Sequence, residues 1–148
     1  MPTIQHLMTE DHRRCDDIFV EVERDVQAKH WGQAQQAFAS FRNALLQHFE
    51  AEETLLFPAF EAKTGMTQGP TQVMRGEHAE MRDLLQAADA ALAAQDAQTY
   101  TGAAETLLIM MQQHNVKEEH VLYPMCDQRL AAEAEDLVPR LQGCINPA

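Results

Sequence analysis

One eleven-residue stretch occurs twice in the chain and constrains the fold more than any other feature. The first copy, residues 48–58, reads HFEAEETLLFP, and the second, residues 114–124, reads HNVKEEHVLYP. Both follow the pattern His-x3-Glu-Glu-x2-Leu-[Phe/Tyr]-Pro. A further histidine precedes each copy at the same spacing, His12 before His48 and His78 before His114. The repeat predicts a structure built from two equivalent halves.

The pattern of apolar residues indicates long helices. Apolar side chains recur at steps of three, four and seven, which is the periodicity of an amphipathic helix. The expected helices cover about residues 3–29, 33–61, 71–94 and 97–130. No segment alternates with period two, and the connections are short. These features predict an all-α fold, an antiparallel up-down-up-down four-helix bundle.

Turn signals separate the expected helices. We expect a turn at His30-Trp31-Gly32, a central loop over the glycine- and proline-containing residues 64–70, and a turn at Gln95-Asp96 with Asp96 as the helix N-cap. A short fifth helix is expected before Pro139. Pro58 and Pro124 fall inside the second and fourth helices, at the same place after each motif histidine, and predict a bend or an end there.

Composition limits the class of protein. A chain of 148 residues can bury its own core, and we expect one domain over residues 1–148, with the bundle over about 3–130 and an extension over 131–148. The formal charge of −12 argues against nucleic acid and anionic membranes as partners. We find no apolar run of about 18 residues and no basic flank leading into one at the N-terminus.

The cysteines show no metal-site or disulfide pattern. Cys15, Cys126 and Cys144 are widely spaced and lack Cys-x2-Cys pairing, which argues against a disulfide framework and a zinc ribbon. Such usage is typical of a reducing compartment, and we expect a cytoplasmic protein.

The histidines of each half are equally distant from a turn. His30 lies midway along the chain between His12 and His48, and Asp96 lies midway between His78 and His114. In an antiparallel hairpin, such residues lie at the same height, about 27 Å from the turn at about 1.5 Å per residue. A glutamate four residues after a histidine shares its helix face, which adds Glu52 and Glu118. Packing of the hairpins would bring all six side chains to one level of the interior.

Six such side chains need partners when they are buried. Taken singly, a His-x3-Glu pair is a common surface pair, but unsatisfied polar groups in a core cost several kcal/mol each, on the order of 2–7. Two metal ions would satisfy them, with two imidazoles for each metal, bridging carboxylates, and room for water, an oxo bridge or a diatomic ligand. Mixed imidazole and carboxylate ligands favour iron, with manganese or zinc as alternatives.

The four-helix pattern His, His-x3-Glu, His, His-x3-Glu over about residues 3–130 resembles the hemerythrin-like (HHE, cation-binding) domains. The resemblance implies a non-haem di-iron centre. In that centre Glu52 and Glu118 would be bridging carboxylates, and the terminal ligands would be His12, His48, His78 and His114.

The chain departs from the oxygen-carrying hemerythrins at two places. Those carriers have a fifth histidine four residues after the third-helix ligand, where this chain has Arg82. They also have an aspartate five residues after the last motif histidine, where this chain has Glu119 after Glu118. The symmetric four-histidine set is more similar to the hemerythrin-like domain of the proteins that repair iron centres, although their cysteine-bearing N-terminal domain is not present here.

Three functions follow from the resemblance. The first is a di-iron protein that binds or senses O2, nitric oxide or peroxide. The second is a di-iron enzyme that acts on peroxide or nitric oxide, for which the sequence identifies no acid–base residues. The third is an iron donor or buffer in the stress repair of iron centres. Oligomeric state is not encoded in any pattern that we recognise.

The other polar residues near the motifs are assigned lesser roles. Glu53 and Glu119 could orient the imidazoles or provide an alternative ligand set, and we expect them to be solvated. His120 has Thr54 at the equivalent place in the first copy and is expected not to be a ligand. His6 and His30 have no repeat counterpart and are expected to be surface residues. Cys15 is expected to be a buried thiol, and Arg82 to contact a ligand carboxylate or close a coordination position.

Overall fold

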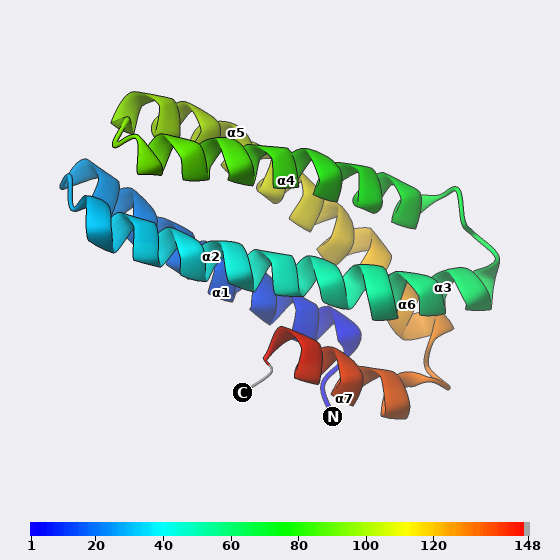
Figure 1. Cartoon of the computed structure of the whole chain (residues 1–148). Helices are drawn as coiled ribbons and strands as arrows, with labels where there is room; N and C mark the ends of the chain where they lie inside the picture. The colour runs from blue at the N-terminus through cyan, green and yellow to red at the C-terminus, as the bar shows by residue number, and fades with distance from the viewer. Residues whose placement is uncertain (147–148) are drawn as a thin grey trace.

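The computed structural model describes residues 1–146, which form five helical rods without any strand (Figure 1). The second and fourth rods each contain a π-helical turn between two α-helices. The rods are, in order, α1 (Ile4–Gln27); α2 (Trp31–Ala51) with η1 (Glu52–Leu56) and α3 (Phe57–Thr64); α4 (Pro70–Ala93); α5 (Ala97–Lys117) with η2 (Glu118–Leu122) and α6 (Tyr123–Arg129); and α7 (Ala134–Ile145). The predicted all-α class is confirmed.

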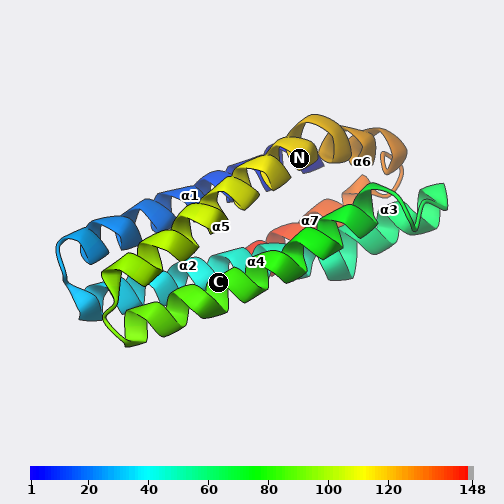
Figure 2. The same cartoon turned by 90° about the horizontal axis from the view of Figure 1, so that it is seen from above.

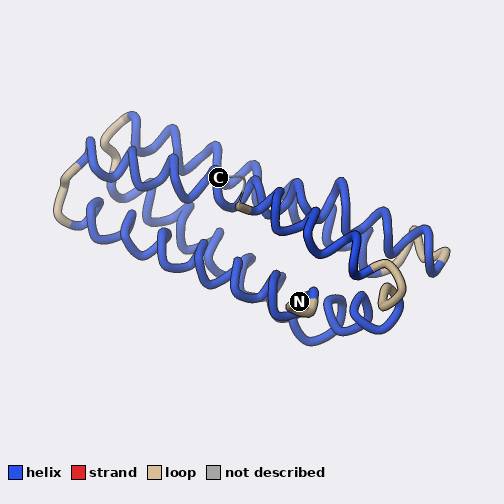
Figure 3. Tube along the Cα trace, turned by 90° about the horizontal axis from the view of Figure 1, so that it is seen from below, coloured by secondary structure: helices blue, strands red, loops and turns tan. Residues whose placement is uncertain are grey.

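The rods pack as two antiparallel hairpins with an added helix. Helix α1 packs along α2, and α4 packs along α5. Both tight turns lie at one end of the bundle, and α3 and α6 lie at the other (Figure 2). Helix α7 packs against α1, α2 and η1 on the outside of the first hairpin. The loops are confined to the ends of the rods (Figure 3), as expected of an up-down-up-down bundle.

The two hairpin turns share one backbone motif. At the end of α1, the His30 N–H donates to the Asp25 carbonyl over 2.9 Å, and the Lys29 N–H donates to the Val26 carbonyl over 3.0 Å. These bonds define a Schellman motif, whose left-handed residue is Lys29 with φ 60°. The same bonds recur in the second hairpin around Gln95, with φ 55°.

The first turn lies earlier than the sequence predicted. It occupies residues 28–30, while Trp31 and Gly32 already belong to α2. The prediction was wrong because the Schellman motif uses Lys29 as its left-handed residue and does not need the glycine. The predicted N-cap Asp96 is confirmed, since its side chain accepts from the Thr99 N–H over 3.1 Å.

A π-helical turn precedes each internal proline. The Phe57 N–H donates to the Glu52 carbonyl, and the Tyr123 N–H donates to the Glu118 carbonyl, five residues back in each case. The next residue is Pro58 or Pro124, which has no N–H to donate. The rods therefore continue through the prolines instead of ending at them.

Side chains approach the backbone carbonyls that lack a proline donor. Gln5 Nε2 donates to the Glu119 carbonyl over 2.8 Å, and Arg75 Nη1 lies 3.5 Å from the Glu53 carbonyl. Each of these carbonyls stands five residues before a proline. In both halves, a side chain from another helix thus approaches the carbonyl oxygen that the proline leaves without a backbone donor.

The π-turns rotate the helix face that points inward. One extra residue shifts all later side chains by about 100° relative to a continuous α-helix. Val121 and Leu122 were both expected in the core; Leu122 is buried, but Val121 is 54% exposed. The prediction for Val121 was wrong because this residue lies within the π-turn.

The hydrophobic core has two parts. One lies toward the hairpin turns and includes Phe19, Phe38 and Phe41. The other lies toward α3, α6 and α7 and includes Phe57 and Phe60. Buried histidine and glutamate side chains lie between the two parts of the core. We call them the polar layer: His12, His48, Glu52, His78, His114 and Glu118.

The fifth helix is longer than expected and runs through Pro139. Proline inside a helix costs about 3 kcal/mol. Four apolar side chains of α7 are buried in the second part of the core, each contributing roughly 1.5–3 kcal/mol: Leu137, Val138, Leu141 and Ile145. Burial of this face outweighs the lost hydrogen bond. Within residues 1–146, no helix combines the length and apolar character required to cross a membrane.

The left-handed turn residues provide a test of the fold. Replacing Gln95, whose φ is 55° and whose side chain is exposed, with glycine should relieve backbone strain. We expect the free energy of unfolding to rise by roughly 0.5–1 kcal/mol, measured by thermal and urea denaturation. Gln95→Ala is the matched control and should leave stability nearly unchanged. A glycine variant less stable than the alanine variant would contradict this backbone assignment.

Candidate metal centre

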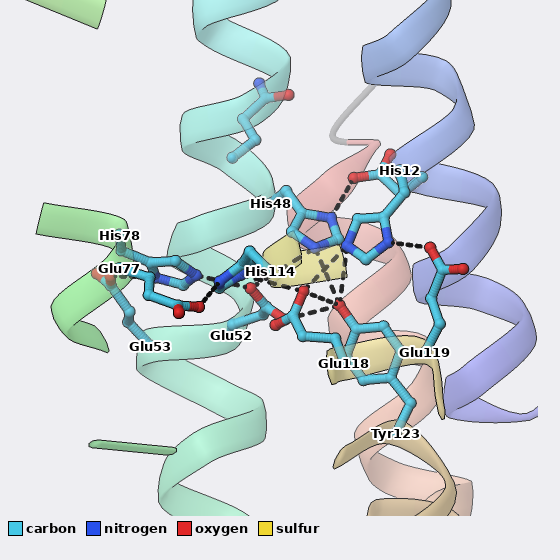
Figure 4. A network of polar contacts seen from close by, with 12 residues as sticks. His12, His48, Glu52, Glu53, Glu77, His78, His114, Glu118, Glu119 and Tyr123 are labelled. Carbon is cyan, nitrogen blue, oxygen red and sulfur yellow. Dashed lines mark hydrogen bonds and ion pairs between the residues drawn. The ribbon is translucent and has the colours of Figure 1, made fainter. Parts of the chain in front are cut away.

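All six residues singled out by the repeat lie in the polar layer between the two parts of the core (Figure 4). None is more than 4% exposed. They come from all four bundle rods at one height: His12, His48, Glu52, His78, His114 and Glu118. The structure thus brings together the set that equal spacing from the turns predicted.

The two inner glutamates each touch both hairpins. Glu118 Oε1 lies 3.0 Å from His12 Nε2 and 3.2 Å from His114 Nε2. Glu52 Oε1 lies 3.1 Å from His78 Nε2 and 3.6 Å from His48 Nε2. Each carboxylate therefore stands between one histidine of its own hairpin and one of the other.

The Nδ1 atom of each of these four histidines is hydrogen-bonded to a further carboxylate, which we call an outer carboxylate. The His12 Nδ1 donates to Glu119 and the His48 Nδ1 donates to Asp11, both over 2.7 Å. The second half repeats this arrangement, with His78 donating to Glu53 over 2.7 Å and His114 donating to Glu77 over 2.8 Å. These bonds fix the tautomer in which Nε2 faces the interior and can bind a metal.

Two of these outer carboxylates correct the sequence interpretation. Glu53 and Glu119 were expected to be solvated, but their side chains are only 22% and 28% exposed and bind His78 and His12. Both lie in the π-turns, and each binds a histidine of the opposite hairpin. Asp11 and Glu77 were missed, although each directly precedes an upstream histidine and the two occupy equivalent places in the repeat.

Basic side chains accompany three of the outer carboxylates. Arg14 pairs with Asp11 and Lys117 pairs with Glu77. Arg82 donates to both oxygens of Glu53 over 2.9 Å, so it contacts this outer carboxylate and not the inner Glu52. The arginine that replaces a fifth histidine thus supports the orientation of His78.

The two halves differ at the residue that directly precedes the motif proline. Tyr123 of the second motif aligns with Phe57 of the first. The phenol oxygen lies 2.7 Å from Glu52 Oε2 and 2.9 Å from Glu118 Oε1. It is also 3.2 Å from His12 Nε2 and 3.1 Å from His48 Nε2. The motif showed this position as Phe or Tyr, but its spacing did not predict a role for the hydroxyl.

Four donor atoms in the layer have no hydrogen-bond partner among the described residues. They are Glu52 Oε1, His78 Nε2, His114 Nε2 and Glu118 Oε2. One donor atom from each of these residues lies within 4.8 Å of the others, and His12, His48 and Glu118 form a second such group. Both groups consist of nitrogen and oxygen donors alone, which fit iron, manganese or zinc.

The carboxylates of the layer raise the pKa of His48 and His114. Burial disfavours the imidazolium of His114, but Glu118 and its neighbours outweigh this effect and raise the pKa of His114 to about 9. Burial also opposes the charge on His48, yet Glu52 and Asp11 hold its pKa well above the ordinary value. A metal cation can therefore replace protons as the counter-charge of the carboxylates.

The remaining candidates lie outside the layer. His6 and His30 are exposed, as expected, and His120, which was expected not to be a ligand, is exposed as well. Cys15 is buried at 1% exposure, and burial raises the pKa of its thiol to about 11. This confirms the expected buried thiol.

The raised pKa of His114 predicts how stability depends on pH. A group whose pKa is higher in the folded state stabilises it below the unfolded value of about 6.5, and this contribution is lost as pH rises through the folded value. The melting temperature of metal-free protein should therefore fall between pH 6.5 and about 9. A zinc-loaded sample, with neutral imidazoles throughout, is the control and should not show this loss. A metal-free melting temperature that rises over this range would contradict the charge assignment.

The outer carboxylates predict a second effect. Glu53→Gln and Glu119→Gln should weaken metal binding by roughly 10–100-fold, because each replaces the charged acceptor that orients an imidazole with a neutral amide. Competition with a chromophoric chelator measures the change. The exposed Glu50 lies beside the first motif, and Glu50→Gln is the matched control. Unchanged affinity in both test variants would show that the outer carboxylates do not support the ligands.

Comparison with known proteins agrees with this geometry. The model of the hemerythrin HHE cation binding domain matches residues 3–126. No curated protein and no solved structure gave a significant match. The match covers both motifs and all six inner residues, whose buried histidine and glutamate groups can hold a metal. The chain belongs to the hemerythrin HHE cation-binding domain family.

Proposed function

We propose that the polar layer binds two iron ions and that the resulting centre binds O2, nitric oxide or peroxide. In this proposal His12 and His48 hold one iron, His78 and His114 hold the other, and the carboxylates of Glu52 and Glu118 serve both. The observation that carries the proposal is the set of four buried donor atoms without partners. Such atoms are costly in a protein interior unless a cation binds them.

The composition of the donor set supports iron. Imidazole nitrogens with carboxylate oxygens suit iron, and the two donor groups contain no thiolate. The contacts of each inner glutamate with histidines of both hairpins support a shared pair of cations over two separate sites. The four-helix bundle provides one motif from each half, as di-metal carboxylate bundles do.

The burial of the layer supports a small ligand. Glu52, His78 and Glu118 are fully buried, and Phe49 stacks on His78 with a ring-centroid distance of 3.9 Å. Phe57 lies over the same imidazole at 5.8 Å. Such burial beside phenyl rings favours a ligand as small as a diatomic gas or peroxide over a larger substrate.

The chain's own residues would position and tune the metals. Bound iron would supply reversible one-electron chemistry and an open coordination position. The outer carboxylates hold the imidazoles in the metal-binding tautomer, as the Nδ1 contacts indicate. The Tyr123 hydroxyl can donate a hydrogen bond within the layer, since its oxygen lies 2.7 Å from a carboxylate.

The charge and the cysteines support the remaining parts of the proposal. A formal charge of −12 fits a protein that handles cations and avoids nucleic acid and anionic membranes. All three cysteines are free thiols, as is usual in the cytoplasm.

Metal analysis of protein purified without chelators tests the proposed function. We expect about two irons per chain, with charge-transfer absorption appearing after exposure to air. His48→Ala should lower the iron content, whereas His120→Ala, which removes an exposed histidine from the same type of motif, should not. One iron or none in the unaltered chain, or equal loss in both variants, would overturn the two-iron assignment.

A further inference from the structure

The polar layer has two halves, one around His78 and His114 and one around His12 and His48, and among the described residues only the second contains a hydroxyl group. All four donor atoms without partners are the ones grouped around His78 and His114, beside Phe57. In the half containing His12 and His48, the phenol oxygen of Tyr123 lies within 2.7 to 3.2 Å of both imidazoles and both inner carboxylates. One half is therefore preset for a cation, and the other is closed by a hydroxyl group.

The position of the phenol oxygen conflicts with a metal at His12 and His48. A first-row metal stands about 2.0–2.2 Å from its nitrogen and oxygen ligands. An oxygen atom already surrounded by four donor atoms at 2.7 to 3.2 Å occupies that place. Metal binding in this half requires the ring to move aside and breaks its buried hydrogen bonds.

The opposite half makes no such demand. His78 Nε2 lies 3.1 Å from Glu52 Oε1, and His114 Nε2 lies 3.2 Å from Glu118 Oε1, but neither nitrogen forms a hydrogen bond within residues 1–146. Phe57 offers no polar atom to compete with a cation. Binding here replaces two imidazole–carboxylate contacts but displaces no hydroxyl group.

We infer that the two metal positions load in order: a divalent cation binds first and more tightly at His78 and His114, and Tyr123 weakens the position at His12 and His48. This inference rests on the proposed two-metal function and adds the inequality of its two positions. In the absence of metal, the Tyr123 hydroxyl occupies the position at His12 and His48. A metal binds there only when the hydroxyl moves away and the donor atoms bind the metal instead.

Titration of the metal-free full chain with Co²⁺ under nitrogen tests the order, with cobalt absorption and calorimetry as readouts. Loss of one or two buried hydrogen bonds should separate the two binding steps by about tenfold or more. The tight step should persist in His12→Ala and disappear in His78→Ala. Circular dichroism of each metal-free variant establishes that its helices are intact.

Tyr123→Phe removes the hydroxyl group from the His12 and His48 position, which then has a phenyl ring as the His78 and His114 position does. This variant provides the decisive comparison. The weaker step should strengthen until the two steps differ by less than about threefold, because no hydroxyl then competes for the donors. Phe57→Tyr is the reciprocal variant and should weaken the tight step.

The outcomes separate this inference from the proposed function. Two equal steps in the unaltered chain, a tight step that disappears in His12→Ala, or a weaker second step in Tyr123→Phe would each overturn the loading order. The last result would identify the phenol oxygen as a metal ligand. Uptake of fewer than two cations by the unaltered chain would overturn the proposed function together with the inference.

Discussion

The need to neutralise charge inside the bundle governs the rest of the structure. Two inner and four outer carboxylates surround four imidazoles, and three basic side chains, Arg14, Arg82 and Lys117, partner the outer carboxylates. Buried carboxylates are unfavourable without compensating charge. The carboxylates raise the pKa of His48 and His114, so the proton on these imidazoles can supply that charge, and cations can replace it. Both parts of the hydrophobic core are arranged around this layer.

The repeat explains how the layer is assembled. Residues at corresponding places in the two halves play equal parts throughout: the left-handed turn residues Lys29 and Gln95, the π-turns, the inner glutamates and the outer carboxylates. Two similar hairpins that pack against each other place equivalent side chains around a common centre. The symmetry ends at Tyr123 and Phe57, and at α7, which packs mainly against the first hairpin and has no counterpart on the second among residues 1–146.

The sequence was sufficient to predict the all-α bundle and the six inner residues, because helical periodicity and equal distances from the turns depend only on spacing. It did not predict the exposure of Val121, since a π-turn inserts a residue that periodicity cannot reveal. The partners of Glu53 and Glu119, which lie in these turns, are on the opposite hairpin and could not be read from spacing along one rod. Tyr123 was not recognised because its hydroxyl matters only in relation to histidines on other rods.

The division of contacts between the hairpins has a consequence for folding. Each inner glutamate contacts a histidine of the opposite hairpin, and the His12–Glu119 and His78–Glu53 bonds also cross from one hairpin to the other. An isolated hairpin therefore contains two of the histidines, one inner glutamate and two outer carboxylates. Only one of these outer carboxylates, Asp11 or Glu77, has its histidine partner in the same hairpin. The complete polar layer therefore forms only when the two hairpins dock against each other.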